Sequence, residues 1–99
     1  MATLRIDFQD GFTDDSVVVR VGGQEVYRGD NLRTSRLLGF AHTVSADVPA
    51  GRVMVEVEVP SREMSGSAAL QVEEAAYLGV SIADDGISFT PSGGPFGYA

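Results

Sequence analysis

The 99-residue sequence contains no cysteine, no lysine, no tryptophan and a single histidine. Without cysteine, neither a disulfide framework nor a thiolate metal site can form, so packing must supply the stability. Seven arginines face fourteen aspartates and glutamates, and the resulting net charge of −7 makes nucleic acid and anionic membranes poor partners. No apolar run reaches transmembrane length and no secretory leader is evident, so we expect a cytoplasmic protein without a membrane partner.

The hydrophobic residues that are present follow a period of two, which is typical of half-buried β-strands. The pattern is clearest over 52–59, where four valines alternate with Arg52, Met54 and two glutamates. Eight such short segments predict one domain over 1–91, followed by a tail over 92–99. The fold class that we predict is an all-β antiparallel sandwich of seven or eight strands, immunoglobulin-like or transthyretin-like.

A predicted hairpin joins the segments on either side of residues 22–23, because two adjacent glycines suit a type I′ turn. In this register an apolar pair faces the core and an Arg/Glu pair faces solvent. Counting outward from the turn gives the pairs Val21–Gln24, Arg20–Glu25 and Val19–Val26.

A second hairpin is predicted around PAGR, residues 49–52. It would pair Val48 with Val53 and Val44 with Val57, so that the apolar faces of both strands coincide.

The segment 29–39 is the least strand-like part of the sequence. It is too short and too rich in breakers for a helix, so we expect a long loop that crosses between the sheets.

The chain resembles the transthyretin-like sandwiches, and more narrowly PEGA modules and carboxypeptidase regulatory-like domains, in VVVRVGGQEVYRG, HTVSADVPAGRVMVEVEVP and LQVEEAAYLGVSI. Those families place a V-x-V-x-G-x-x-V hairpin before an extended strand, a P-x-G turn and an alternating strand, as 17–26 and 43–59 do here. The chain lacks the Gly-Tyr pair that typically follows the P-x-G strand, and its 29–39 loop is not part of their compact form. The resemblance implies a non-catalytic scaffold or binding module of bacterial style.

Simple up-and-down alternation of the strands would gather four loops, 9–15, 29–38, 60–66 and 83–86, at one end of the sandwich. Carboxylates are concentrated there, and their oxygens are the ligands that Ca²⁺ needs, so calcium is the one cofactor that the sequence suggests. The spacing does not match a calcium-binding loop, and Asp and Gly are also ordinary turn formers. The candidate metal ligands are Asp10, Asp14, Asp15, Asp84 and Asp85, with Asp30 and Glu63 in the same loops.

Protein interaction, including self-association into a homo-oligomer, is the function that we expect. The outer strands of an open sandwich expose unpaired backbone groups. The two rings of the 92–99 tail could dock on a partner, or could cover the open end of their own core. The candidate interaction residues are Met54, Tyr77, Phe96 and Tyr98.

The alternative is a ligand-binding module that uses the acidic loop end for calcium or carbohydrate. Carbohydrate would need exposed aromatic rings, and the candidates are Tyr27, Tyr77, Tyr98 and Phe12.

Catalysis and adhesion fit the sequence less well. Acid–base or nucleophilic catalysis usually needs His, Cys or a desolvated carboxylate pair, and His42 falls on the inward side of its strand, where we expect a half-buried histidine. We therefore expect that the protein is not an enzyme.

The tripeptide Arg28-Gly29-Asp30 matches an adhesion motif, but we expect it to be a strand end followed by a turn.

Overall fold

The computed structural model describes residues 2–35, 39–94 and 96 of the chain. These residues form eight β-strands and one short 3₁₀ turn, because the alternating segments pair into sheets almost from end to end. The elements are β1 (Ala2–Phe8), β2 (Thr13–Val21), β3 (Gln24–Arg33), β4 (His42–Val48), β5 (Gly51–Val59), η1 (Pro60–Arg62), β6 (Met64–Val72), β7 (Ala75–Ala83) and β8 (Gly86–Ser92).

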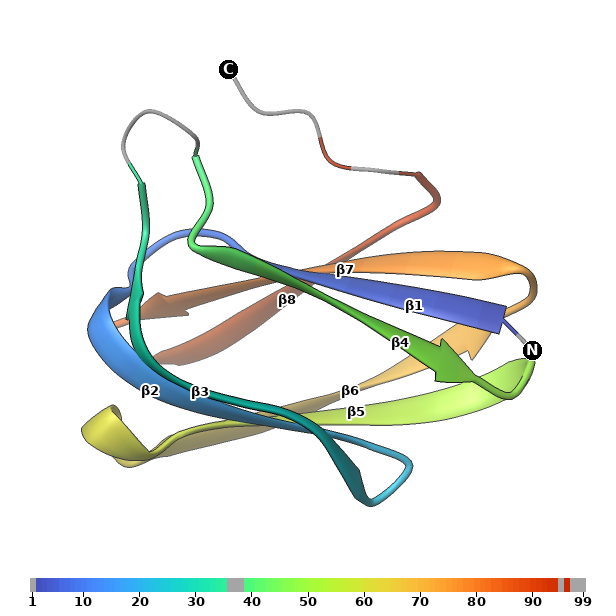
Figure 1. The fold of residues 1–99 in the computed structure, drawn as a ribbon, viewed down its shortest axis with the longest axis horizontal. Coiled ribbons are helices and arrows are strands. Elements are labelled where there is room, and N and C mark those ends of the chain that lie inside the picture. The colour runs from blue at the N-terminus through green and yellow to red at the C-terminus, as the bar shows by residue number, and fades with distance from the viewer. Residues whose placement is uncertain (1, 36–38, 95, 97–99) are drawn as a thin grey trace.

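The strands form two four-stranded sheets that pack face to face (Figure 1), with the orders β4-β1-β7-β8 and β3-β2-β5-β6. The predicted all-β sandwich is confirmed. One pairing departs from the antiparallel prediction, since β1 and β7 run parallel. Successive strands alternate in direction along the chain, so β1 and β7 point the same way, and they pair parallel because the crossover from β6 brings β7 beside β1.

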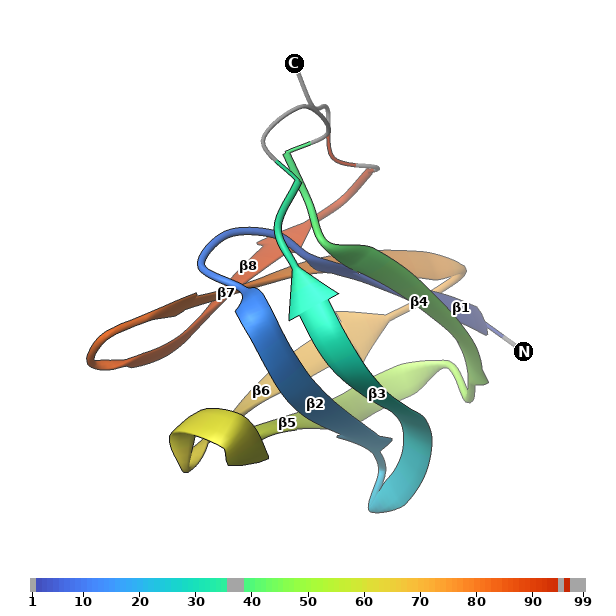
Figure 2. The same cartoon turned by 60° about the vertical axis from the view of Figure 1, so that its left-hand side comes forward.

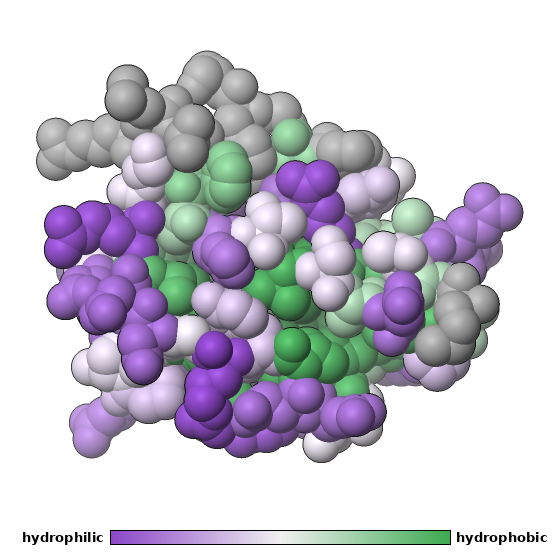
Figure 3. All heavy atoms as spheres, in the orientation of Figure 1, coloured by the Kyte–Doolittle hydropathy of each residue, from purple (hydrophilic) through white to green (hydrophobic). Residues whose placement is uncertain are grey.

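The core lies between the two sheets and is filled by the inward positions of the alternating strands. Leu4, Ile6 and Phe8 of β1 are fully buried, as are Val55 and Val57 of β5. Seen from the side, hydrophobic residues form a band between the layers, and hydrophilic residues lie along the lower layer (Figure 3). The period-two pattern therefore predicted correctly which face of most strands is buried.

The β2–β3 hairpin confirms the first two predicted pairs but not the third. Val19 lies opposite Tyr27, not Val26, because the register shifts between Val19 and Arg20. This β-bulge reverses the orientation of the residues that follow it in β3. As a result Val26 is 37% exposed, whereas the Tyr27 ring, expected on the surface, packs against the core.

The second predicted hairpin is wrong. The strands β4 and β5 belong to different sheets, so the PAGR turn at 49–52 crosses from one layer to the other. Val44, Val48, Val53 and Val57 are nevertheless all buried, because both strands turn these residues toward the core that the two sheets share.

The predicted long loop over 29–39 is shorter than expected, because β3 continues to Arg33 with Leu32 buried. At the chain end, Ser92 still belongs to β8, and Phe96 is half-buried. Tyr98, the other ring of the predicted tail, lies outside the described residues.

Candidate interaction surface on the β3-β2-β5-β6 sheet

The acidic end of the sandwich is organised around the turn that joins β1 to β2. The Ile82 N–H donates to the Asp10 carbonyl at 3.0 Å, and the Thr34 hydroxyl donates to the Gln9 carbonyl at 2.6 Å. Gly11 has φ +91°, and a Cβ there would lie 1.9 Å from the Ile82 carbonyl oxygen, so only glycine fits. The loops predicted to share an end therefore do meet around this turn.

Asp15 is the one candidate metal ligand that the structure buries, with 4% of the residue exposed. Its two oxygens accept from Arg62 Nε and Nη2, both at 3.0 Å, and from the Ser61 hydroxyl and the Thr13 N–H, both at 2.9 Å. Burial raises the pKa of the Asp15 carboxyl, but the donors, led by Arg62, outweigh it and hold that pKa below its usual range. The carboxylate therefore fastens β2 to η1.

The other candidate ligands are exposed, and the structure does not bring them together. Among residues 2–35, 39–94 and 96, no three His, Asp or Glu side chains are placed to share a metal ion. Calcium binding therefore stays a prediction without a carboxylate cluster to support it. The exposed candidates are Asp10, Asp14, Asp84 and Asp85.

The ring and adhesion candidates are placed differently from their predictions. His42 is exposed at the start of β4, where it stacks on Tyr27 with ring centroids 5.1 Å apart. Phe12, expected on the surface, is buried against Phe8. The Arg28-Gly29-Asp30 tripeptide lies within β3, not at a turn.

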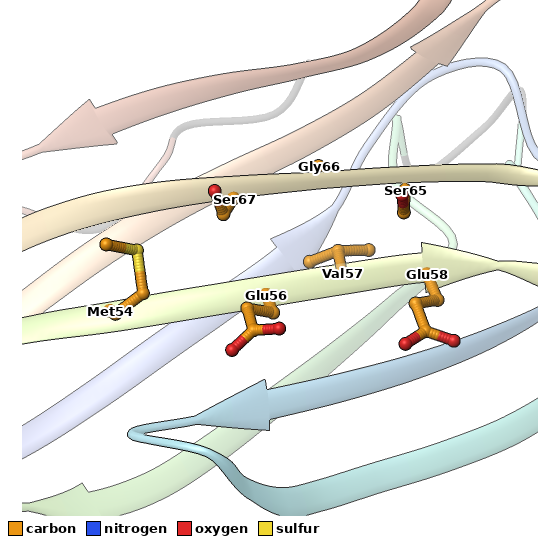
Figure 4. Close-up of a pocket in the computed structure, with 7 residues that line it drawn as sticks. All are labelled: Met54, Glu56, Val57, Glu58, Ser65, Gly66 and Ser67. Carbon is orange, nitrogen blue, oxygen red and sulfur yellow. The ribbon is translucent and has the colours of Figure 1, made fainter.

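A hollow of about 430 Å³ lies on the outer side of β5 and β6, which we call the β5–β6 face. In Figure 4, Glu56 and Glu58 extend from β5 toward β2, away from β6. Arg20 of β2 forms an ion pair with Glu58. The β6 side of this hollow is lined by the uncharged residues Ser65, Gly66 and Ser67.

A second hollow, of about 290 Å³, adjoins the β5–β6 face where the β2–β3 and β4–β5 turns meet. Val26 and Met54, 37% and 43% exposed, are the exposed large hydrophobic residues of the described chain, and both line it. Val48, Pro49 and Val53 add further apolar surface, with Asp47 and Arg52 also on its wall. We call it the Val26–Met54 hollow.

The predicted interaction residues are not gathered at one place. Met54 lies on the β5–β6 face, whereas Tyr77 is half-buried in β7, on the other sheet. The sequence did not point to Val26, since alternation placed it in the core. Its exposure depends on the bulge in the β2–β3 ladder, for which the alternating pattern carries no signal.

No protein family and no curated protein matches this chain. The transthyretin-like resemblance thus stays a prediction. Within the described part of the chain, no helix has the length and apolar character needed to cross a membrane.

Proposed function

We propose that the chain is a non-catalytic protein-interaction module of the cytoplasm, and that the Val26–Met54 hollow receives an apolar side chain of a partner protein. One observation supports this best: both exposed large hydrophobic residues of the described chain line a single hollow. Binding energy at protein interfaces is concentrated where an apolar anchor fills such a pocket. The volume of about 290 Å³ accommodates a side chain and not a whole peptide.

The hollow also has charged residues at its rim, as protein interfaces usually do. Asp47 and Arg52 offer one charge of each sign beside the apolar wall, so a partner backbone can be oriented by polar contacts at the rim. The net charge of −7 argues for a protein partner and against nucleic acid or an anionic membrane.

The proposal is tested by NMR titration of the ¹⁵N-labelled chain with N-acetyl-leucine amide, which carries an apolar side chain and a peptide-like backbone. We expect saturable shifts confined to the amides around Val26 and Met54, with a dissociation constant of about 1–10 mM. N-acetyl-glycine amide, which lacks the side chain, should not produce them.

The matched variants are Val26→Ser, which removes one wall of the hollow, and Ala69→Ser, which changes an exposed residue of β6 opposite Met54. Binding should be lost in the first and kept in the second. Shifts that scatter over the surface, or that persist in Val26→Ser, would overturn the proposal.

A further inference from the structure

Each sheet of the sandwich ends in two outer strands, and among the residues that the structure describes β6 is the one outer strand whose own sequence carries no protecting feature. Proteins usually guard such edges with charges, proline or bulges, since a bare edge pairs with other strands. Three of the outer strands carry such protecting features. Strand β3 has four charged residues and register shifts, β4 has Asp47, and β8 has Pro91. Strand β6 has nine residues, MSGSAALQV, without a charge, a proline or a register shift.

The backbone groups that β6 presents outward follow from the ladder on the far side of β5. The Gly22 N–H donates to the Met54 carbonyl at 2.9 Å, so the even-numbered residues of β5 bond to β2 and the odd-numbered ones bond to β6. Through the regular β5–β6 register, the even-numbered residues of β6 are then the ones that bond to β5. The N–H and C=O groups that face away from the sheet belong to Ser65, Ser67, Ala69 and Gln71.

We propose that this edge binds a second copy of the chain, with the two β6 strands antiparallel and Ala68 opposite Ala68 of the other copy. The inference rests on the proposed function as an interaction module and names its partner at a second surface. This register pairs the strand over its whole length, 64–72, so every outward N–H and C=O finds a partner. The β3-β2-β5-β6 sheets of the two copies become one continuous sheet, because β6 is the last strand of each (Figure 2 shows β6 beside β5).

Charge favours this register over the one centred on Ser67. Within one chain, Glu58 lies beside Ser65 and Arg52 lies beside Gln71. Centring on Ala68 sets Ser65 opposite Gln71 of the other copy. The line of neighbouring side chains across the sheet then runs from Glu58 and Ser65 of one copy to Gln71 and Arg52 of the other, so an acid and a base lie in the same line. Centring on Ser67 would instead align the Glu56 rows of both copies, acid toward acid.

Proline substitution tests the edge without breaking the sheet inside one chain. Ser67→Pro removes an outward N–H and leaves the β5–β6 hydrogen bonds in place. Ser45→Pro is the matched control, because Ser45 is an exposed serine on the outer strand β4. Its N–H also faces away from the sheet. The Thr3 N–H bonds to Glu74 on the β7 side, so the odd-numbered residues of β1 bond to β7, and the even-numbered residues of β1 bond to even-numbered residues of β4.

Sedimentation velocity of the full chain, from about 10 µM to about 1 mM, reports the mass. We expect wild type and Ser45→Pro to pass from 10.4 kDa toward twice that mass, and Ser67→Pro to dimerise about tenfold more weakly or worse. A monomeric wild type, or a dimer that survives Ser67→Pro, would overturn the inference. Neither result touches the leucine-amide titration of the Val26–Met54 hollow, so the two proposals fail separately.

Cysteine cross-linking fixes the register and does not depend on the proline variant folding. The chain has no native cysteine, so any disulfide comes from the introduced residues. In the proposed register Ser67 faces Ala69 of the other copy, about 5.5 Å away between Cα atoms, within disulfide reach. A mixture of Ser67→Cys and Ala69→Cys should cross-link between the two variants. Faster cross-linking of either variant with itself, or none, would refute this register.

Discussion

The ion pair between Asp15 and Arg62 gives the sharpest prediction about stability. Replacing Asp15 with Asn keeps the shape of the side chain and removes its charge. One carboxylate oxygen becomes an NH₂ group, which cannot accept the hydrogen bonds that Oδ2 now accepts from Arg62 and the Thr13 N–H.

The magnitude follows from the burial and the number of donors. The Asp15 side chain is 5% exposed and that of Arg62 is 25% exposed, so water replaces the lost acceptor only on the Arg62 side. Two hydrogen bonds to a charged group are lost, each contributing about 1.5–3 kcal/mol. We therefore expect Asp15→Asn to lower the free energy of unfolding by about 3 kcal/mol at pH 7, which lowers the Tm by about 12–24 °C for a domain of this size.

The pH dependence has a definite sign. The pKa of Asp15 is lower in the folded than in the unfolded chain, so its contribution is fully present above the ordinary aspartate pKa and is lost as the pH falls through the folded-state value. The wild-type advantage over Asp15→Asn should therefore shrink as the pH falls below about 4.

Urea unfolding followed by circular dichroism measures both effects, with Glu58→Gln as the control. Glu58 also pairs with an arginine, but its side chain is 42% exposed, so its loss should cost less than about 1 kcal/mol. If Asp15→Asn costs no more than Glu58→Gln, or if its cost is the same at pH 3 and pH 7, the Asp15–Arg62 pair does not hold β2 and η1 together as argued.

Three further predictions follow from backbone geometry and burial. Gly11→Ala should lower the free energy of unfolding by about 3–5 kcal/mol in the same urea assay, because the φ of Gly11 is +91° and a Cβ would clash with the Ile82 carbonyl. Gly23→Ala should lower it by about 1 kcal/mol, because Gly23 has a similar φ of +83° but lies in open space. Val57→Ala should cost about 2–3 kcal/mol and Val26→Ala less than about 0.5 kcal/mol, and equal losses would contradict the bulge that exposes Val26. Melting curves with calcium and with chelator should agree within about 1 °C, since Arg62 already pairs with Asp15; a clear rise with calcium would restore the acidic end as a metal site.

The sequence predicted burial well because burial along a strand is a local property. Successive side chains point to opposite faces, so alternation alone identified the buried hydrophobic residues of β1, β5 and β7, although it placed Asp7, which is also buried, on the outer face. Pairing is not local. Val48 and Val53 bring their apolar faces together equally well side by side in one sheet or opposite each other across two, so the parity of residues around PAGR could not distinguish a hairpin from a crossing turn.

The candidate site was harder to predict than the fold, because it depends on one irregularity. Met54 was identified from its outward parity, and it is 43% exposed. Val26 has the parity of a core residue and reaches the surface only because the β2–β3 register shifts between Val19 and Arg20. A bulge changes the backbone without changing the alternation of residue types, so the second wall of the hollow becomes visible only in three dimensions.

The bare edge of β6 is not something that the fold requires. Ser65, Ser67, Ala69 and Gln71 are exposed, so a charged side chain at any of them would cost little stability. Charged residues make up 21% of the chain, and the ten-residue edge strand β3 carries four of them, whereas the nine-residue β6 carries none. A charge on this edge would cost almost no stability, and the strand nevertheless has none. We expect this of a surface that was selected for strand pairing.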